Sequence, residues 1–414
     1  MSAPGTVIVG AGQAGVQVAL SLRELGYDKP ITIFNNEELL PYQKPPLSKG
    51  FMMGKIAQEG LYLRNPDYFA RAGISIVSEH VDAVDRAARK VIGRSGTHTE
   101  YEALVLATGS RNRALELPGV ELDGVLSLRS FDDAAVLRER MGAARNVVVI
   151  GAGFIGLEFA AAASKSGTRV HVVEAASRPM ARAVTPEVST YFTQRHMDRG
   201  TTFSFGDTVQ RIEGSSGRVV SVHTAQHEAL PADLVLIGVG VIPNSELAHA
   251  AGLATDNGII VDAHLVTSDP SVSAVGDCAV YPNAFSKSLL RVESVQNAVD
   301  HGRLVAARLT GNRTAYCAVP WFWSDQGEDK LQIAGISLAG DERFAKGDHM
   351  SGRFSVFLFR AGSLVCVESV NRVADHMAAR SLLKSGRLGR VTPDIARSED
   401  FDLKAYAAKE VAEA

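Results

Sequence analysis

Short runs of apolar residues that end in glycine recur along the chain and predict buried strands. The first run, residues 6–9, leads into a glycine-rich turn at residues 10–15, and apolar residues at helical spacing follow over residues 16–25. Gly26 stops this helix, and another apolar run at residues 31–34 predicts the next strand. The order strand, turn, helix, strand is typical of a parallel sheet with crossover helices.

The same order returns in the middle of the chain. An apolar run at residues 146–150 precedes a second glycine-rich turn at residues 151–156. A helix follows and ends near Ser166, and residues 170–173 form the next apolar run. The chain therefore contains two similar α/β units.

Other segments carry signals of their own. Residues 104–109 and 234–238 read as apolar strands that end in glycine, and a helix is expected from about Ser294 to Leu309. Ser130-Phe-Asp-Asp133 predicts a capping box at the start of the helix that precedes the second unit. Two further strands and two further helices are thus expected outside the two units.

The pattern changes after Pro320. Residues 353–370 alternate like a hairpin around the turn at 361–363, and residues 374–384 have helical spacing. These signals predict a separate C-terminal α+β domain.

Composition narrows the class of protein. The 414 residues are 46% hydrophobic and 21% charged with a net charge of −3, which fits a globular protein and argues against a nucleic-acid binder. No secretory signal or membrane span is visible, and Cys278, Cys317 and Cys366 lie far apart. We therefore expect a soluble protein of the cytoplasm.

The two glycine-rich turns have the G-x-G-x-x-G spacing of dinucleotide-binding sites. The first glycine makes the tight turn, the second lets the backbone approach the pyrophosphate, and the third packs helix against strand. The helix N-terminus then presents unpaired N–H groups to the phosphates. One such pattern means little in a glycine-rich chain, but two copies, each between a strand and a helix, predict two Rossmann-like dinucleotide-binding domains.

The two copies differ where a carboxylate should hold the ribose. Glu174 closes the second strand of the second unit, as in an NAD site. The first unit carries Asn35 and Asn36 at that point, and its nearest acid, Glu37, lies further along. The first unit is therefore expected to bind its ribose differently, with Asn36 as the candidate.

Longer strings make the resemblance specific. The two fingerprints, Thr108-Gly109 and Ala274-Val-Gly-Asp277 resemble the flavoprotein reductases with two dinucleotide-binding domains. Residues 40–49, 291–297 and 320–326 resemble one branch of them, the FAD-dependent NADH:ferredoxin reductases of the putidaredoxin reductase and biphenyl dioxygenase ferredoxin reductase type. These enzymes serve bacterial cytochrome P450s and Rieske-type oxygenases.

The resemblance, which extends over about residues 6–385, implies three domains. Residues 1–112 and 245–318 would form a discontinuous FAD-binding domain of the glutathione-reductase-like type. Residues 113–244 would form the NAD-binding domain, and residues 319–414 a C-terminal α+β domain that covers the flavin. The implied chain is a monomer or a weak homodimer with no metal.

The resemblance also implies the cofactor contacts. For FAD, the matching residues are Gly10, Gly12, Ala14, Gly15, Asn36, Lys49, Val81, Thr108, Gly109, Arg129, Asp277, Val295 and Trp323. For NADH, they are Gly151, Gly153, Ile155, Gly156, Glu158, Glu174 and Gly238. Lys49, Glu158 and Trp323 are the catalytic candidates, with Lys49 and Glu158 as an ion pair near the flavin.

Missing cysteines indicate the electron acceptor. The chain has no cysteine before Cys278, where related disulfide reductases have a redox pair, and Cys278 is expected to be a small buried packing residue. Electrons should then leave the flavin directly for a [2Fe-2S] ferredoxin. Arg303 falls where the resemblance places a ferredoxin-contacting arginine, whereas Arg308 and Arg313 are expected to be solvated surface charges.

Two other functions stay open. One is an NADH-dependent reductase of a small acceptor of the quinone or monodehydroascorbate type, and the other is an NADH-sensing flavoprotein with a binding role. The histidines show no metal-ligand spacing, and His196, His249 and His301 are expected at the surface. Gly327-Glu-Asp329 departs from the family pattern, and the surface near the flavin edge is expected to differ there.

Overall fold

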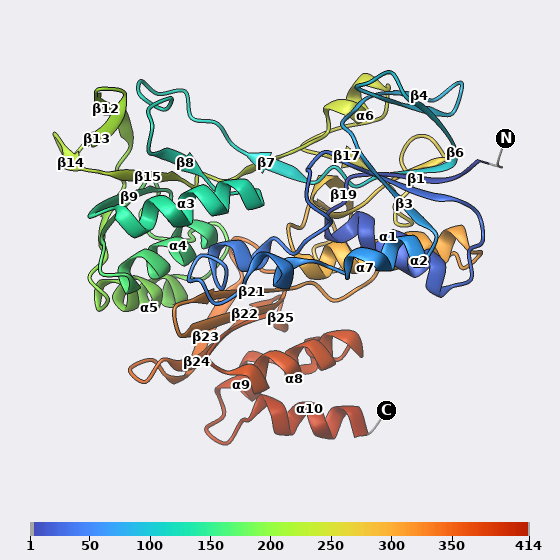
Figure 1. The fold of residues 1–414 in the computed structure, drawn as a ribbon. Helices are drawn as coiled ribbons and strands as arrows, with labels where there is room; N and C mark the ends of the chain where they lie inside the picture. The colour runs from blue at the N-terminus through green and yellow to red at the C-terminus, as the bar shows by residue number, and fades with distance from the viewer. Residues whose placement is uncertain (1–3, 413–414) are drawn as a thin grey trace. The chain divides into compact units, whose positions relative to one another are not determined.

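The computed structural model describes residues 4–412, and the chain divides into two compact units (Figure 1). The first unit consists of the chain up to Gln43, Glu59–Arg111 and Ile242–Phe322. The second unit consists of Lys44–Gln58, Asn112–Val241 and the chain from Trp323 onward. The chain crosses between the units within the paired strands β7 (Ser110–Asn112) and β16 (Val241–Pro243), and also at residues 43–44, 58–59 and 322–323.

A mostly parallel sheet forms the centre of the first unit. On one side of β6 lie the parallel strands β1, β2 and β3. On its other side, β18 pairs with it in parallel, and β5 and β4 form an antiparallel extension. The strands are, in sheet order, β3 (Ile74–Ser78), β2 (Ile31–Asn35), β1 (Gly5–Val9), β6 (His98–Leu106), β5 (Lys90–Gly93) and β4 (Val81–Asp85), with β18 (Val272–Ala274) on β6. A small sheet contains β17 (Ile259–Ile260), β19 (Ala279–Pro282) and β20 (Leu289–Leu290).

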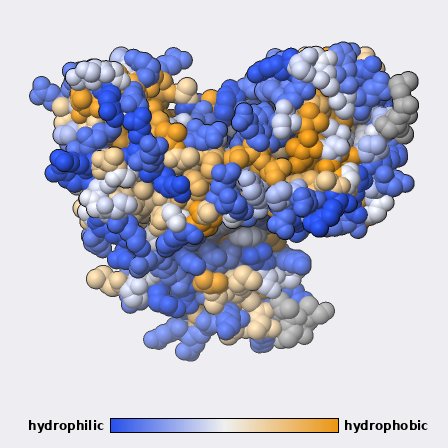
Figure 2. Space-filling model, viewed as in Figure 1, coloured by the Kyte–Doolittle hydropathy of each residue, from blue (hydrophilic) through white to orange (hydrophobic). Residues whose placement is uncertain are grey.

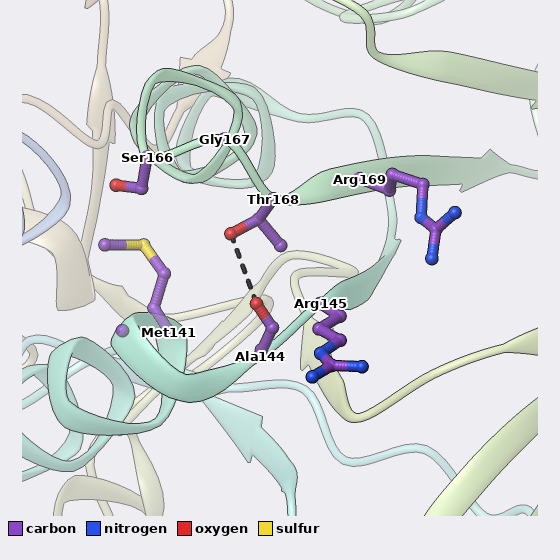
Figure 3. A pocket seen from close by; sticks show the side chains of 8 residues that line it. Met141, Ala144, Arg145, Ser166, Gly167, Thr168 and Arg169 are labelled. Atoms are coloured by element: carbon purple, nitrogen blue, oxygen red, sulfur yellow. Dashed lines mark hydrogen bonds between the residues drawn. The ribbon is translucent and has the colours of Figure 1, made fainter.

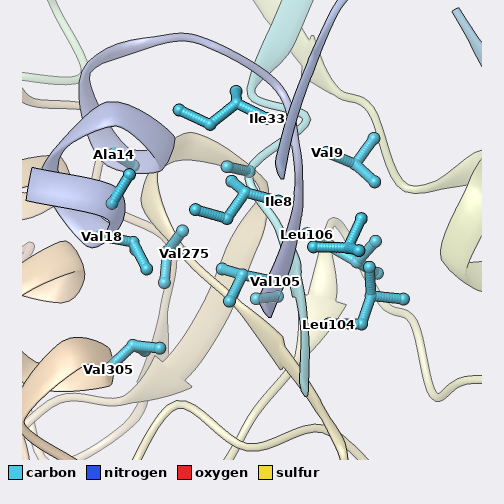
Figure 4. Packing of buried hydrophobic residues seen from close by; sticks show 14 of the residues in the cluster. Ile8, Val9, Ala14, Val18, Ile33, Leu104, Val105, Leu106, Val275 and Val305 are labelled. Atoms are coloured by element: carbon cyan, nitrogen blue, oxygen red, sulfur yellow. The ribbon is translucent and has the colours of Figure 1, made fainter. Parts of the chain in front are cut away.

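Helices α1 (Gln13–Glu24) and α7 (Val295–Leu309) lie side by side against this sheet (Figure 1). They approach closely at Gly302, where a Cβ would lie 3.0 Å from the carbonyl oxygen of Ala14. Apolar side chains of both helices and of the parallel strands point into one core, as Figure 4 shows for Val18, Val305 and Val105. Short helices α2 (Pro66–Arg71) and α6 (Glu246–Ala250) complete the unit.

The second unit contains a fully parallel sheet. Its order is β11 (Thr202–Phe205), β10 (Arg169–Glu174), β9 (Asn146–Ile150), β15 (Leu234–Ile237) and β8 (Val125–Ser127). Helix α4 (Phe154–Lys165) packs on β9 and β10, and α3 (Phe131–Ala143) packs on β8. Helix α5 (Pro186–Met197) and the sheet of β12 (Val209–Ser215), β13 (Arg218–Thr224) and β14 (Leu230–Pro231) complete this half.

The C-terminal part of the second unit is a sheet with helices. Its strands are, in order, β21 (Trp321–Gln326), β22 (Asp329–Gly335), β25 (Ser363–Val370), β24 (Arg353–Arg360) and β23 (Glu342–Asp348). Helix α8 (Val373–Lys384) packs on β22 and β25, and α10 (Leu403–Ala412) runs alongside α8 (Figure 1). Helix α9 (Pro393–Arg397) lies between them in sequence.

The fold class is confirmed: two Rossmann-like units and a C-terminal α+β part are present. The capping box is also confirmed, since Ser130 Oγ accepts a hydrogen bond from the Asp133 N–H and the Asp133 carboxylate accepts one from the Ser130 N–H. The domain limits at residues 112, 244 and 318 stay a prediction.

Three surface expectations were wrong. His196 and His301 are fully buried, because each lies on the inner face of a helix that packs against its unit. Arg308 turns inward and donates a hydrogen bond to Ser273 Oγ, so it is not a solvated charge. His249 and Arg303 are exposed as expected. In the Gly327-Glu-Asp329 departure, Gly327 and Glu328 are exposed, whereas Asp329 is buried and binds Arg195 and Arg199, so a different local surface there stays a prediction.

Hydrophilic side chains cover most of the surface of each part in Figure 2. Among residues 4–412, no helix combines the length and the apolar character needed to cross a membrane.

Candidate functional site

The two glycine-rich turns have the same backbone arrangement. The Gly10 N–H donates to the Phe34 carbonyl over 2.9 Å, and the Gly151 N–H donates to the Val173 carbonyl over 2.8 Å. Both glycines have φ near +100°, at +111° and +101°, which disfavours any residue with a Cβ. Each turn therefore joins its first strand to its helix in the same way.

The third glycine of each turn permits close packing. A Cβ on Gly15 would lie 2.1 Å from the Gly10 carbonyl oxygen, and a Cβ on Gly156 would lie 2.3 Å from the Gly151 carbonyl oxygen. Real Cβ atoms do not approach backbone oxygens so closely, so both positions require glycine.

The second glycine of each turn faces space instead. A Cβ on Gly12 would meet no heavy atom within 4 Å, and a Cβ on Gly153 would meet only the Gly238 carbonyl oxygen at 3.9 Å. No side chain caps the N-terminus of α1 or of α4, so the first-turn N–H groups are left for a ligand. A pyrophosphate fits this combination of open space and unpaired donors at both turns.

The ribose ends of the two turns differ. Because Phe34 and Val173 occupy the same hydrogen-bonding position, Asn35 is the backbone counterpart of Glu174. Asn35 is buried and donates to the carbonyls of residues 37 and 39, over 2.8 and 2.7 Å. Asn36, the candidate from the sequence, is the first exposed residue beyond the strand.

Glu174 anchors the second turn as well as ending the strand. Its carboxylate accepts the Ala152 N–H over 2.7 Å and the Ala176 N–H over 2.8 Å. Nearby Arg178 donates to the carbonyls of Ala181 and Val184, so its guanidinium is occupied within its own loop. Arg182 is exposed, so the preference for a ribose with two hydroxyls over a 2′-phosphate rests on the Glu174 carboxylate.

Hydrogen bonds from neighbouring residues of the first unit fix the candidate residue Asp277. The Ser110 hydroxyl donates to the Asp277 carboxylate over 3.2 Å, and Arg291 donates to the Asp277 carbonyl over 3.1 Å. The Gly276 N–H donates to His301 Nδ1 over 3.1 Å, and burial lowers the His301 pKa to about 3. A neutral histidine beneath the turn thus helps to fix Asp277, a role that the sequence did not indicate.

The strand end at Thr108-Gly109 is fixed by hydrogen bonds to Asn244. The Thr108 hydroxyl donates to the Asn244 carbonyl over 2.6 Å, and the Asn244 amide donates to the Thr108 carbonyl over 2.8 Å. Gly109 has φ +65° and accepts the Asn244 N–H over 2.9 Å.

The structure brings Lys49 and Glu158 together within the second unit. Lys49 Nζ lies 2.7 Å from Glu158 Oε2, although the residues are 109 positions apart. The 3₁₀ turn at Pro45–Ser48 places Lys49 beside α4, and the preceding Ser48 donates to the same oxygen over 2.6 Å. Ser324 of β21 donates to Oε1 over 2.7 Å. Both serines lie in the strings that carried the resemblance, but no sequence signal gave them a role.

The remaining candidates are spread over the two units. In the first unit, Val81 is buried at the start of β4, and Val295 is the first residue of α7, directly after its N-cap Ser294. In the second unit, Arg129 precedes the capping box of α3, Trp323 is half-buried on β21, and Ile155 is 38% exposed on α4.

A surface hollow of about 280 Å³ lies elsewhere in the second unit. Arg145, Thr168 and Arg169 line it at the start of β9 and β10, the opposite end of these strands from the Gly151 turn (Figure 3). Figure 3 draws one hydrogen bond between the residues that line this hollow, from the Thr168 hydroxyl to the Ala144 carbonyl. None of the candidate residues contributes to it.

Known proteins match the whole chain. Rhodocoxin reductase of Rhodococcus erythropolis is 46% identical over 97% of this chain and 94% of its own length. The crystal structure of the ferredoxin reductase for the CYP199A2 system of Rhodopseudomonas palustris superposes with a TM-score of 0.94 at 49% identity, covering 97% of this chain and 99% of that one. A chain of the covalent putidaredoxin reductase–putidaredoxin complex superposes with a TM-score of 0.95 at 37% identity, and the match covers 100% of this chain and 100% of that one.

Two family models match in succession. The Reductase C-terminal model matches residues 321–407. The pyridine nucleotide-disulphide oxidoreductase model matches residues 5–302. The chain belongs to the pyridine nucleotide-disulphide oxidoreductase family, whose members use FAD and NAD(H).

Proposed function

We propose that the chain is an FAD-dependent NADH:ferredoxin oxidoreductase that supplies a [2Fe-2S] ferredoxin of a cytochrome P450 or Rieske-type oxygenase. The observation that carries this function is the pair of complete dinucleotide turns in a chain that has no cysteine before Cys278. Relatives similar over nearly the whole chain are reductases of such carriers by name, and one was solved in covalent complex with putidaredoxin.

The first turn binds FAD and the second binds NADH in this proposal. Bound FAD supplies acceptance of hydride as an electron pair and release of single electrons. The chain supplies the rest: Gly12 and Gly153 admit the two pyrophosphates, and Asp277 binds ribityl hydroxyls. Val295 would hold the flavin at the N-terminus of α7, whose partial positive charge favours negative charge nearby. Trp323 would contribute an aromatic surface to the same site.

Lys49 and Glu158 form the ion pair beside the reacting rings in this proposal. Their 2.7 Å contact is largely buried, with 18% and 4% of the two side chains exposed, so water screens it weakly. Such a pair orients the nicotinamide without entering the reaction covalently.

The electron acceptor follows from the cysteines. Cys278 and Cys366 are fully buried, and burial raises the pKa of both thiols, which makes them poor nucleophiles. Cys317 is exposed and lies far from both in sequence. A thiol relay of the disulfide-reductase kind is therefore unsupported, and three unpaired thiols fit the cytoplasm.

Arg303 is the proposed contact with the ferredoxin. Its side chain is 66% exposed on α7, and its nearest acidic atom is Asp300 Oδ1 at 3.6 Å. Arg308, on the same helix, is turned inward and serves as a matched non-docking position. An exposed arginine steers an acidic partner mainly through the association rate.

Cytochrome c reduction tests the function directly. The purified protein should show a flavin absorption band near roughly 450 nm that bleaches anaerobically with NADH. Cytochrome c reduction by NADH should then depend on added [2Fe-2S] ferredoxin. Rapid turnover with a quinone or monodehydroascorbate, without need for ferredoxin, would support a small-acceptor reductase. Slow turnover with every acceptor would support an NADH sensor.

Two sets of variants refine the test. Arg303→Ala should slow ferredoxin-dependent reduction, more at low salt, and leave NADH-to-dye turnover unchanged.

Replacing all three cysteines with serine should leave dye turnover within about a few-fold, unless buried hydroxyls damage folding. A folded, FAD-loaded triple variant without turnover would show that a thiol relay exists.

A further inference from the structure

The Glu158 carboxylate is held by three donors from distant parts of the chain. Ser48 and Lys49 donate to Oε2 over 2.6 and 2.7 Å, and Ser324 donates to Oε1 over 2.7 Å. Glu158 itself is only 5% exposed. Both oxygens are thus assigned to particular partners, and the carboxylate cannot rotate without losing one of them.

A second layer of buried polar groups stands behind Ser324. Gln326 Nε2 lies 3.4 Å from Ser324 Oγ, and His196 Nε2 lies 2.9 Å from Gln326 Oε1. Ser324, Gln326 and His196 are all fully buried. They come from β21 and from the last turn of α5, so the contact joins the C-terminal sheet to the NAD-binding half of the second unit.

The chemistry of the groups sets the direction of every bond. A carboxylate can only accept, so the Ser324 hydroxyl donates to Glu158 and its oxygen accepts from the Gln326 amide. Burial lowers the pKa of His196 to about 4, so the ring is neutral, and its Nε2–H donates to the Gln326 oxygen. His196 Nδ1 has no hydrogen-bond partner within residues 4–412. All the donors therefore point towards Glu158.

Burying these three polar side chains lowers the stability of the folded protein, so we expect them to serve a function. Burying a polar side chain destabilises a protein unless its hydrogen bonds are satisfied. The series of hydrogen bonds from His196 to Glu158 begins at a histidine whose Nδ1 has no partner among residues 4–412. Apolar residues could fill the same volume with less risk. This series of hydrogen bonds ends at Glu158, the acidic residue that the proposed function places beside the nicotinamide.

We propose that Ser324 is a positioning residue for hydride transfer, with Gln326 and His196 holding its hydroxyl. Because Ser324 binds Oε1, Oε2 stays hydrogen-bonded to Lys49 and Ser48. The Glu158 carboxylate is therefore held in one orientation relative to the proposed nicotinamide site. This inference rests on the proposed function and adds a residue to it that touches neither cofactor.

Ser324→Ala tests the proposal through the rate of flavin reduction by NADH in anaerobic stopped flow. Loss of a hydrogen bond to a charged group predicts a rate about tenfold lower, with FAD content unchanged. Ser355→Ala is the matched control: Ser355 is fully buried in the same C-terminal sheet and donates to the Asp375 carboxylate over 2.8 Å. The control should lose stability and keep the rate.

A double-mutant cycle separates positioning from general damage. If Ser324 acts through the carboxylate, Ser324→Ala should lower the rate less than about twofold in a Glu158→Gln background. Additive losses, or a Ser324→Ala rate equal to that of Ser355→Ala, would overturn the proposal. If Ser324→Ala does not load FAD, Ser324→Cys, which keeps the volume but donates weakly, is judged by the same two criteria. Failure of the unaltered protein to be reduced by NADH would instead refute the proposed function.

Discussion

The two glycine-rich turns share a backbone arrangement, and a different residue ends the strand that follows each turn and its helix. Both have a first glycine at φ near +100°, a third glycine against the carbonyl of the first, and a second glycine facing space. At equivalent positions the first turn has Asn35 and the second has Glu174. The backbone of both turns therefore fits a pyrophosphate, and the candidates for holding the ribose lie at the end of the following strand, Glu174 in the second unit and Asn36, directly after Asn35, in the first.

The contrast extends to what that residue does in the protein. Glu174 reaches back and accepts the Ala152 N–H of its own turn. Asn35 turns the other way and stabilises the loop over residues 37–39, where Glu37 also binds the Tyr42 hydroxyl. The first unit thus uses this position to order the segment that leads towards Lys49, whereas the second uses it to order the turn itself.

Valine at the second glycine of each turn should separate the two sites most strongly. Both glycines have φ near −75° and space for a side chain, so Gly12→Val and Gly153→Val should fold. Gly12→Val should weaken FAD binding at least about a hundredfold, because the side chain fills the place of the pyrophosphate. Gly153→Val should keep FAD and lose NADH binding by a similar factor.

Flavin absorbance and NAD⁺ titration measure these two affinities. The control is Gly142→Val, since a Cβ at that helical position also meets nothing within 4 Å and lies in neither turn. If Gly12→Val retained FAD, or Gly153→Val lost it, the assignment of cofactors to turns would be wrong.

Coenzyme preference should depend on Glu174 and not on Asn35. A carboxylate accepts both ribose hydroxyls of NADH and repels the 2′-phosphate of NADPH, so kcat/KM should favour NADH at least about tenfold. Glu174→Ala should lower the ratio of kcat/KM for NADH to kcat/KM for NADPH. Because this variant also frees the N–H groups of Ala152 and Ala176, the ratio of the two coenzymes is the informative quantity.

Asn35→Asp provides the comparison in the first turn. It should leave the NADH:NADPH ratio of kcat/KM unchanged, since the first turn is proposed to bind FAD. Equal or better use of NADPH by the unaltered enzyme would refute the assignment of Glu174.

Acidification should affect the first unit through His301. Burial holds its pKa at about 3, below the ordinary 6.5, so the folded state stays neutral while the unfolded state takes up a proton. Stability should therefore fall as pH drops from about 6.5 towards 3, by up to about 1.4 kcal/mol per pH unit. His301→Gln keeps an acceptor for Gly276 but cannot be protonated, so the melting temperature should depend less on pH. His249→Gln, at an exposed histidine, should leave the pH dependence unchanged.

Glu368 of the second unit should act in the opposite direction. Burial raises its pKa to about 7 from 4.5, so the folded state binds a proton first as pH falls. Its contribution should increase stability as pH drops from about 7 to 4.5 and be lost as pH rises through that window. Glu368→Gln, measured by the same melting curves, should remove this dependence.

Much of the fold could be predicted because its signals are local. Gly10 and Gly151 follow apolar strands at fixed spacing, and the Ser130 capping box contains both partners within four residues. The burial of His196 and His301 could not be predicted, because helical spacing does not reveal which face packs until the partner is known. The Ser324–Glu158 bond joins residues 166 positions apart, and only the folded chain brings them together.

Two helix caps provide the smallest and finest test of the comparison. Ser130 caps α3 of the second unit, and Ser294 caps α7 of the first, where its hydroxyl accepts the Asn297 N–H over 3.0 Å. Replacing either serine with alanine should lower the free energy of unfolding by about 1 kcal/mol, since each change removes one N-cap acceptor. Only Ser294→Ala should also weaken FAD binding, because Val295 and the N-terminus of α7 are proposed to face the flavin. Denaturant melts and FAD titration of the two variants give both quantities. Equal FAD affinity in the two variants would remove α7 from the flavin site, and FAD loss in Ser130→Ala would point to Arg129, whose N–H donates to the Asp133 carboxylate of the same capping box.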